Sequence, residues 1–152
     1  MLDQELLRPS LKEGGVKATK SYDLDKLIYV GFFGGILPVL ALGTVNAVWL
    51  RADKKRTMLL LTAGLTVLAG RFAAIVATGE EGAVFVHSRL AGIVMAFAYR
   101  FALKKRYRLH TVLQGEHKSM AKAGLVGGVA GFVAEAVLIR LGEGIHHVTH
   151  TG

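Results

Sequence analysis

Four ionisable side chains stand inside long apolar stretches of the sequence, where charged residues are rare: Arg71, His87, Arg89 and Glu135. If each stretch is helical, with a rise of about 1.5 Å per residue, Arg71, Arg89 and Glu135 all lie roughly 10–12 Å from stretch ends on one side. A charge at that depth in an apolar layer costs at least roughly 2–3 kcal/mol unless it is paired or hydrated. We therefore expect an internal ion-pair network centred on Glu135, the only acid of the four.

Two interpretations of this charge cluster remain open, and they differ in chemistry. In the first, the ion pairs are a structural staple that holds three helices together. In the second, two arginines and a histidine outnumber one carboxylate, so the excess positive charge would suit an anionic ligand, a lipid headgroup or an anion path. A further alternative is that some of these side chains extend to the surface of the apolar layer.

A stripe of glycines leads up to Glu135 on the same predicted helix. Gly124, Gly128, Gly131 and Glu135 follow one another at intervals of four, three and four residues, so they share one helical face. Gly127 forms a further pair with Gly131. Helices approach closely across such stripes because no side chain separates their backbones. The stripe therefore predicts tight packing against another helix, either of this chain or of a second copy.

The elements that position these residues are four apolar blocks. Hydrophobic residues make up 52% of the 152 positions and the mean hydropathy is +0.43, which leaves too little polar surface for a soluble domain of this size. Each block reaches about the 20 residues that cross roughly 30 Å of hydrocarbon. We expect an all-α, polytopic membrane protein, a bundle of four transmembrane helices over residues 27–50, 57–78, 83–103 and 121–141.

The first of these blocks is the least regular. It contains Gly31, Gly34 and Gly35, followed by Pro38. Because proline removes a backbone donor and disrupts a helix, the block either spans the membrane with a kink or forms a broken, re-entrant helix. Gly31 and Gly35 also have the spacing of a helix-packing pair. The sequence leaves both arrangements open.

The two ends of the chain are expected to be tails. Residues 1–26 form a polar N-terminal tail in which four leucines define one face of a short amphipathic helix: Leu2, Leu6, Leu7 and Leu11. Residues 142–152 form a C-terminal tail with three histidines: His146, His147 and His150. Two of them have the spacing of a metal-binding pair, but only Glu143 lies near them as a further ligand, so we predict no metal site.

The distribution of charge predicts an orientation. The chain has a net charge of +8, and its basic residues concentrate in the connection at 51–56 and in the one after residue 103, whereas the second connection carries Glu80 and Glu81. The positive-inside rule places the first and third connections in the cytoplasm. With four spans both tails would lie on the opposite side, although the basic N-terminal tail opposes this. A re-entrant first block would remove the conflict by keeping that tail cytoplasmic.

Several chemistries are excluded or unsupported by the sequence. The absence of cysteine excludes disulfides and thiolate sites. We find no phosphate-binding loop, nucleophile elbow, haem-attachment or HExxH motif, so we predict no catalytic residue, no cofactor and no enzyme. Aromatic stacking platforms are absent, so nucleic acid is not an expected partner. Anionic lipids are expected partners at connections one and three, and four basic residues would contact them in the third: Lys104, Lys105, Arg106 and Arg108.

The sequence thus predicts a non-enzymatic integral protein of a bacterial cytoplasmic membrane. It would assemble as a homo-oligomer, or serve as a small subunit of a larger membrane complex, and pack through its glycine-rich last helix and intramembrane ion pairs. The alternative is a small transporter or channel, anion or proton-coupled, whose path passes Arg71, Arg89 and Glu135. A wet cavity at that cluster would favour transport, whereas a dry and paired cluster would favour a structural role.

Overall fold

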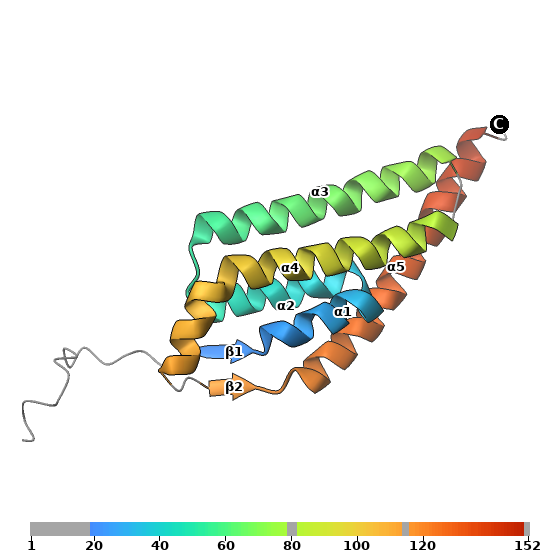
Figure 1. Ribbon diagram of the computed structural model, residues 1–152. Helices are drawn as coiled ribbons and strands as arrows, with labels where there is room; N and C mark the ends of the chain where they lie inside the picture. Colours follow the sequence, from blue (N-terminus) through green and yellow to red (C-terminus); the bar gives the residue numbers. More distant parts are fainter. Residues whose placement is uncertain (1–18, 79–81, 114–115, 151–152) are drawn as a thin grey trace, which may run out of the picture.

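The computed structural model describes residues 19–78, 82–113 and 116–150 (Figure 1). These residues form two short strands, one 3-10 helix and five α-helices, in the following order: β1 (Lys20–Tyr22), η2 (Leu24–Lys26), α1 (Leu27–Gly34), α2 (Ile36–Trp49), α3 (Lys54–Thr78), α4 (Gly82–Val112), β2 (Glu116–Lys118) and α5 (Met120–His150). The nearly all-helical content agrees with the predicted all-α class. The expected amphipathic helix of the N-terminal tail and the Glu80–Glu81 connection lie outside the described residues.

The first apolar block forms two helices instead of the single helix expected over residues 27–50. Between α1 and α2, Gly35 has φ 75° and ψ −157°, a backbone conformation that is essentially restricted to glycine. A continuous helix would also bring the ring of Pro38 against the carbonyl of Gly34, four residues earlier. In the first turn of α2 this clash is absent, and the missing N–H of Pro38 costs nothing.

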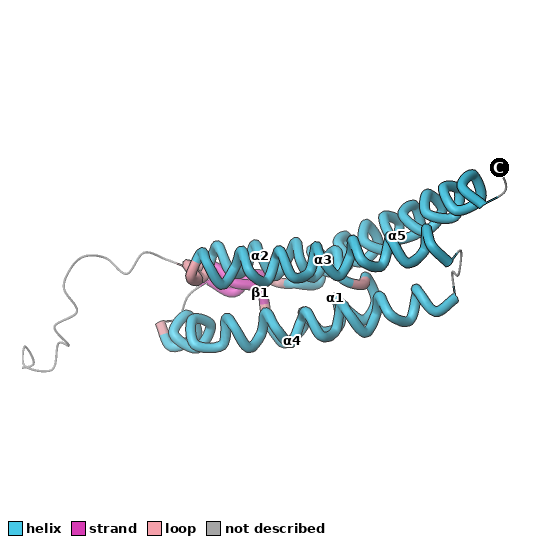
Figure 2. The backbone as a smooth tube through the Cα atoms, turned by 90° about the horizontal axis from the view of Figure 1, so that it is seen from above, coloured by secondary structure: helices cyan, strands magenta, loops and turns pink. Residues whose placement is uncertain are grey.

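The two helices form a hairpin that returns to the end where it began (Figures 1 and 2). Asn46, in the last turn of α2, accepts a hydrogen bond from the Tyr22 N–H at 2.7 Å and donates one to the Tyr22 carbonyl at 3.3 Å. The Tyr22 and Trp49 rings lie 5.0 Å apart, centroid to centroid. Tyr22, at the end of β1 and a few residues before α1, is therefore fixed beside the end of α2. We call α1 and α2 together the hairpin, Gly35 its tip and this closed end its base.

Three long helices surround the hairpin, and α4 runs antiparallel to α3 and α5 (Figures 1 and 2). Among the described residues, two helical segments are both long and apolar enough to cross a membrane, Lys54–Thr78 and Met120–Thr149, while α2 is apolar but shorter. This is fewer than the four spans expected from the sequence. The first block is divided at Gly35, and α4 carries Arg89 and Arg100 in its apolar half.

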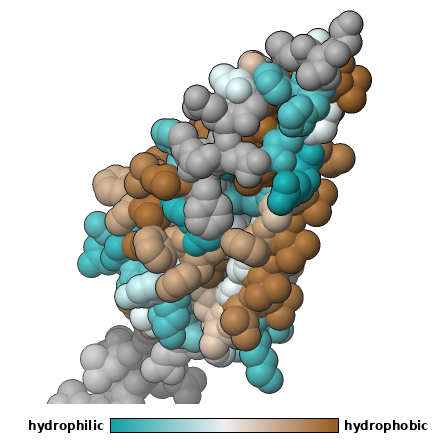
Figure 3. Space-filling view, turned by 90° about the vertical axis from the view of Figure 1, so that its right-hand side faces the viewer, coloured by the Kyte–Doolittle hydropathy of each residue, from teal (hydrophilic) through white to brown (hydrophobic). Residues whose placement is uncertain are grey.

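The buried core lies where the hairpin packs on α4, whereas the outer faces of the long helices are apolar and exposed. Core side chains come mainly from α1, α2 and α4: Leu27, Ile36, Val39, Leu40, Met95, Tyr99 and Leu103. Figure 3 shows hydrophobic side chains along one whole flank of the molecule. On α5 alone the exposed apolar set includes Leu125, Val126, Val129, Phe132, Val133 and Val137. Exposed apolar surfaces of this extent are typical of proteins that contact lipid or other proteins.

Two features at the helix ends differ from the sequence prediction. β1 pairs with β2 in parallel, with Lys20 opposite Glu116, so the start of the described chain lies at the end that carries connections one and three. At the other end, α5 continues through residues 142–150, which we expected to be a tail. Contacts with α3 explain this extension, because Gly142 packs on Ile75 and the His146 ring lies 2.8 Å from the Val76 carbonyl.

Candidate functional site

The hairpin tip reaches a buried carboxylate, Glu135, in the middle of α5. Its side chain is 6% exposed, and Arg71 of α3, whose side chain is 14% exposed, places Nη1 3.6 Å from Glu135 Oε1. Ser88 of α4 donates its hydroxyl hydrogen bond to the same carboxylate oxygen. Residues from α3, α4 and α5 therefore meet at one carboxylate.

The tip itself is fitted to this carboxylate. A side chain at Gly35 would collide with Glu135 Oε1 and would place its Cβ 2.7 Å from Ser88 Oγ. Gly35 is thus required twice, for its positive φ and for the space beside Glu135. Because α2 begins at the next residue, the positive end of its helix dipole lies beside the carboxylate, which is a favourable arrangement.

Arg89 of α4 contacts the hairpin tip through the end of α1. Its Nη1 donates a hydrogen bond to the Phe32 carbonyl. That carbonyl belongs to the last turn of α1, where carbonyl groups have no partner within their own helix. A cation at the carboxyl end of a helix is also favoured by the helix dipole. The broken first block is therefore complemented by charge on both sides of the break, a cation at the end of α1 and a carboxylate at the start of α2.

His87 differs from Arg71 and Glu135 of the predicted cluster in its exposure. It is on the exposed face of α4, while its neighbour Ser88 is fully buried beside Glu135. Successive residues of a helix point about 100° apart, so only one of the two can face the hairpin. Sequence reasoning missed Ser88 because serine is common in helices. Its signal was the spacing that it shares with other inward-facing residues of α4, Gly92, Ala96 and Tyr99.

The predicted glycine stripe of α5 packs against the hairpin of the same chain. A methyl group at Gly131 would lie 2.6 Å from the Gly34 carbonyl oxygen and 2.6 Å from Pro38 Cδ, so this contact is close to the limit. Farther along the stripe the packing loosens, with 3.4 Å from Gly127 to Pro38 and 3.2 Å from Gly124 to Val30 for the same test.

Gly128 behaves differently from its neighbours in the stripe. Its Cα lies close against Gly34, but a methyl group added to it would meet no described atom within 4 Å. On the opposite side of the hairpin, Gly31 of α1 faces Gly92 of α4, and a methyl group on either would lie 2.7 Å from the backbone of the other. The tip region is therefore held by direct backbone approach on two sides.

The space beside the ion pair is small. A cavity of about 10 Å³ lies between α3 and α5, and its lining includes Arg71, Phe72, Ile75 and Glu135. That volume is at the lower limit for a single water molecule. The Arg71 and Glu135 side chains are 14% and 6% exposed, so protein covers most of the pair, and the cavity beside it has room for about one water at most.

Polar groups at the base form a second cluster, which the sequence did not predict. His110 near the end of α4 is buried, with Thr19 Oγ1 2.6 Å from its Nδ1 and the His117 ring 4.9 Å away. Burial lowers the pKa of His110, and the neighbouring His117 lowers it further. Arg100 forms an ion pair with Asp25 at 2.8 Å. The base thus combines strand pairing, histidine contacts and ion pairs near the molecular surface.

The predicted lipid-contacting residues lie in this same end of the molecule. All four are exposed on the last turns of α4: Lys104, Lys105, Arg106 and Arg108. Three of them, with Phe101 and Leu109, line an open surface depression of about 410 Å³. Lysine and arginine side chains that lie next to apolar side chains in this way are typical of residues at a membrane surface.

No family model, curated protein or solved structure matches this chain. The features that bear on function are therefore the hairpin, its enclosed ion pair and the apolar outer faces of the long helices.

Proposed function

We propose that the protein is a non-enzymatic integral membrane protein in which α3, α4 and α5 span the bilayer around a re-entrant hairpin. The 31 residues of α4 extend roughly 46 Å, which exceeds the roughly 30 Å of a hydrocarbon core. The eight residues of α1 extend only about 12 Å and cannot cross it. Irregular backbone such as Gly35 is tolerated at membrane depth when protein covers it, as α4 and α5 do here.

This topology makes the orientation consistent. The base of the hairpin and connections one and three lie at one end, and the positive-inside rule assigns that end to the cytoplasm. Three spans then place the end of α5 on the other side, and the chain contains no Lys or Arg beyond Arg140. The basic N-terminal tail remains cytoplasmic, so it no longer opposes the rule. A bacterial cytoplasmic membrane is the proposed location.

The role that we propose is structural, as a scaffold that assembles with a second copy or serves as a small subunit of a larger membrane complex. The observation that carries this proposal is the enclosure of the Arg71–Glu135 pair, which leaves room for about one water. Its charges are used to hold the hairpin between α3, α4 and α5. The tight part of the glycine stripe is occupied by the hairpin, so the exposed apolar faces of α3 and α5 are the surfaces proposed for partners.

The topology is tested with single cysteines, because the native chain has none. Lys20→Cys, Lys55→Cys and Ser119→Cys should react with an impermeant maleimide only after the cells are permeabilised, whereas His147→Cys should react in intact cells. Labelling of Lys20→Cys in intact cells, with Ser119→Cys protected, would show that the first block spans. Labelling of both in intact cells, with His147→Cys protected, would reverse the orientation.

The structural role is tested by two measurements on the purified protein in mild detergent and in liposomes. We expect one discrete assembly larger than a monomer, or co-purification with other membrane proteins, and no ion flux above that of empty liposomes. A monomer that conducts anions or protons would contradict the proposal.

A transporter or channel is the second candidate, and the hairpin is the observation that favours it. Half-helix ends that meet charged residues at membrane depth are typical of transporter binding sites. In that case the enclosed pair would be a closed state, and Glu135→Gln would abolish a flux that the native protein carries. A lasting flux in that variant would exclude a path through Glu135.

A further inference from the structure

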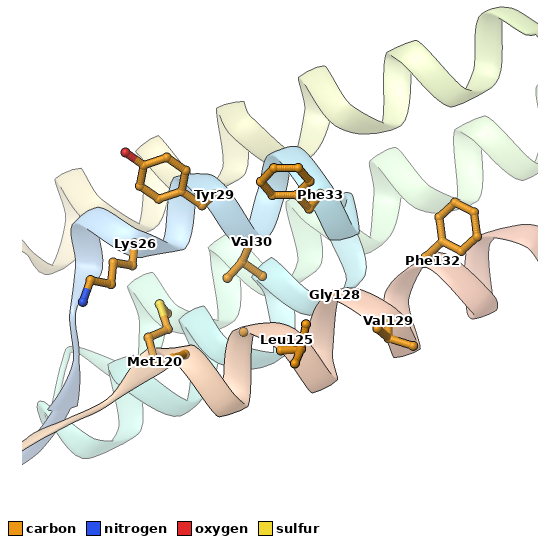
Figure 4. A pocket seen from close by; sticks show the side chains of 11 residues that line it. Lys26, Tyr29, Val30, Phe33, Met120, Leu125, Gly128, Val129 and Phe132 are labelled. Carbon is orange, nitrogen blue, oxygen red and sulfur yellow. The ribbon is translucent and has the colours of Figure 1, made fainter.

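A groove separates α1 from the first half of α5 (Figure 4). It has a volume of about 540 Å³, which lies within the roughly 300–1,000 Å³ usual for small-molecule sites. Its lining is almost entirely apolar or small: Tyr29, Val30, Phe33, Met120, Ala121, Gly124, Leu125, Gly128, Val129 and Phe132. Lys26 is the one charged residue among the described residues that line it. The groove is separate from the ion pair at the hairpin tip.

The groove exists because the glycine stripe of α5 is only partly used by the hairpin. Gly131 is packed to the limit against Gly34, but a methyl group at Gly128 would enter open space, with no described atom within 4 Å. Gly124 is intermediate, since its added methyl group would lie 3.2 Å from Val30. The absence of side chains at Gly128 and Gly124 therefore leaves open space above the backbone of α5, which forms the floor of the groove.

The length of the groove fits one half of a bilayer. Its lining on α5 runs from Met120 to Phe132, which corresponds to roughly 18 Å of helix. One leaflet contributes about half of a hydrocarbon core of roughly 30 Å. The groove has about the length of one leaflet because α1, which forms one of its walls, begins near the base and ends at the tip of the hairpin. A spanning helix of a partner would need a groove through both leaflets, whereas one acyl chain needs only one.

The charge at the groove mouth indicates which lipid fits. The Lys26 side chain is 60% exposed and has a long, 3.8 Å contact with Asp23, so its ammonium group remains accessible. It lies at the base, the end assigned to the cytoplasm by the positive-inside rule, and anionic lipids are abundant in cytoplasmic leaflets. We infer that the groove binds one acyl chain of an anionic phospholipid of that leaflet, with the lipid phosphate at Lys26.

This inference rests on the proposed insertion in a membrane, and it is tested on the full chain. The protein is purified in mild detergent doped with equal amounts of phosphatidylglycerol and phosphatidylcholine, and bound lipid is counted by native mass spectrometry. We expect one retained phosphatidylglycerol, with about fivefold preference over phosphatidylcholine, since a basic residue near an anionic headgroup contributes about 1 kcal/mol. Lys26→Gln should remove that preference, whereas Arg140→Gln should keep it, because the Arg140 side chain is 80% exposed and lies outside the groove on the other half of α5.

The groove itself is tested with a pair of glycine variants. Gly128→Leu fills the floor and should reduce lipid retention at least tenfold, whereas Gly70→Leu should not. Gly70 is a matched control because a methyl group there, on α3, also meets no described atom within 4 Å. Equal retention in both variants would overturn the proposal, as would retention without headgroup preference in the native protein. A phosphatidylglycerol with a photoreactive chain should label residues 120–132, and a crosslink between two copies there would assign the groove to a dimer instead.

The failure of this site and the failure of the proposed function give different results. If the chain is released from membranes by alkaline carbonate, membrane insertion fails and the lipid site fails with it. If the chain stays in the membrane with the expected cysteine topology, but Gly128→Leu retains lipid normally, then only the lipid site is wrong.

Discussion

The two ends of the hairpin are stabilised by different kinds of interaction. At the tip, the backbone of Gly34 approaches α5 directly and a buried carboxylate contacts Arg71 and Ser88. At the base, the hairpin is closed by two hydrogen bonds between the Asn46 side chain and the Tyr22 backbone, one accepted and one donated by Asn46, and by side-chain contacts near the surface. The tip therefore depends on a few groups that have no substitute, because water cannot replace a lost partner there.

The same difference decides how much each group should contribute to stability. A charge at the tip that loses its partner remains buried, whereas a charge at the base becomes solvated. Backbone contacts at the tip leave no room for an added methyl group, whereas side chains at the base can move aside. We therefore expect large effects of small substitutions at the tip and small effects when an exposed charge at the base is removed.

The largest effect is expected for Glu135→Gln, which removes the carboxylate that pairs with the buried Arg71. Removing one member of a buried pair costs about 3–5 kcal/mol, and we expect this loss in the free energy of unfolding in mild detergent. Arg71→Gln in addition should recover part of it, and this coupling measures the pair. Glu116→Gln is the control, because Glu116 pairs with Lys20 at 3.4 Å with its side chain 55% exposed. Strictly additive losses would contradict the pairing.

An intermediate effect is expected for Gly131→Ala, measured by the same unfolding assay. Its methyl group would lie 2.6 Å from the Gly34 carbonyl oxygen, and overpacking of this kind costs about 1–3 kcal/mol. Gly128→Ala, one turn earlier on the same helix, is the matched control. There the methyl group meets open space, and the better helix propensity of alanine should make the change neutral or stabilising by up to about 1 kcal/mol. Equal losses in both variants would show that the stripe is not divided as described.

A smaller effect, restricted to the base, is expected when the pH falls. Burial lowers the pKa of His110 below its ordinary value of 6.5, so the unfolded form takes up the proton first. Stability conferred by neutral His110 should therefore be present above about pH 6.5 and decrease as the pH falls through that value. Trp49 is the only tryptophan of the chain and lies at the same end of the molecule, with its ring 5.0 Å from that of Tyr22, so its fluorescence can be used to follow changes at the base.

The fluorescence of Trp49 should change in the native protein only at a pH below 6.5, because burial and the neighbouring His117 lower the pKa of His110. The change should be lost in His110→Gln and kept in His146→Gln, whose histidine lies at the opposite end of the molecule. A pH response that survives His110→Gln would assign it to another group.

The sequence predicted how far along its helix each residue lies better than it predicted which side of the helix its side chain faces. Counting residues placed Arg71 and Glu135 at one depth, and the structure has them 3.6 Å apart. Depth follows from the constant rise of a helix, whereas the side that a residue faces depends on packing between helices. His87 and Ser88 illustrate this, because one residue of difference separates the exposed face from the carboxylate.

The sequence did not decide between a kinked span and a re-entrant hairpin for the first block. The hairpin is stabilised by contacts between residues that are distant along the chain. Pro38 and the preceding glycines indicated a break, but a kinked span satisfied them equally well. The direction of the turn depends on partners such as Asn46 with Tyr22 and Gly31 with Gly92. The pairing of β1 with β2 had no sequence signal, because three residues are too few to show a period.

The smallest effect is expected for Arg100→Gln at the base, although its ion pair has the shorter distance. Arg100 lies 2.8 Å from Asp25, compared with 3.6 Å between Arg71 and Glu135, so distance alone would rank it first. Burial reverses the ranking, because the side chains of Arg100 and Asp25 are 47% and 65% exposed and water solvates either charge when the other is removed. Exposed pairs contribute about 0.2–1 kcal/mol, and salt screens them, so the loss in Arg100→Gln should shrink further between low and high ionic strength. Arg71→Gln should show almost no such salt dependence. A loss in Arg100→Gln as large as that in Arg71→Gln, and equally insensitive to salt, would show that the base is as dry as the tip and that the two ends do not differ.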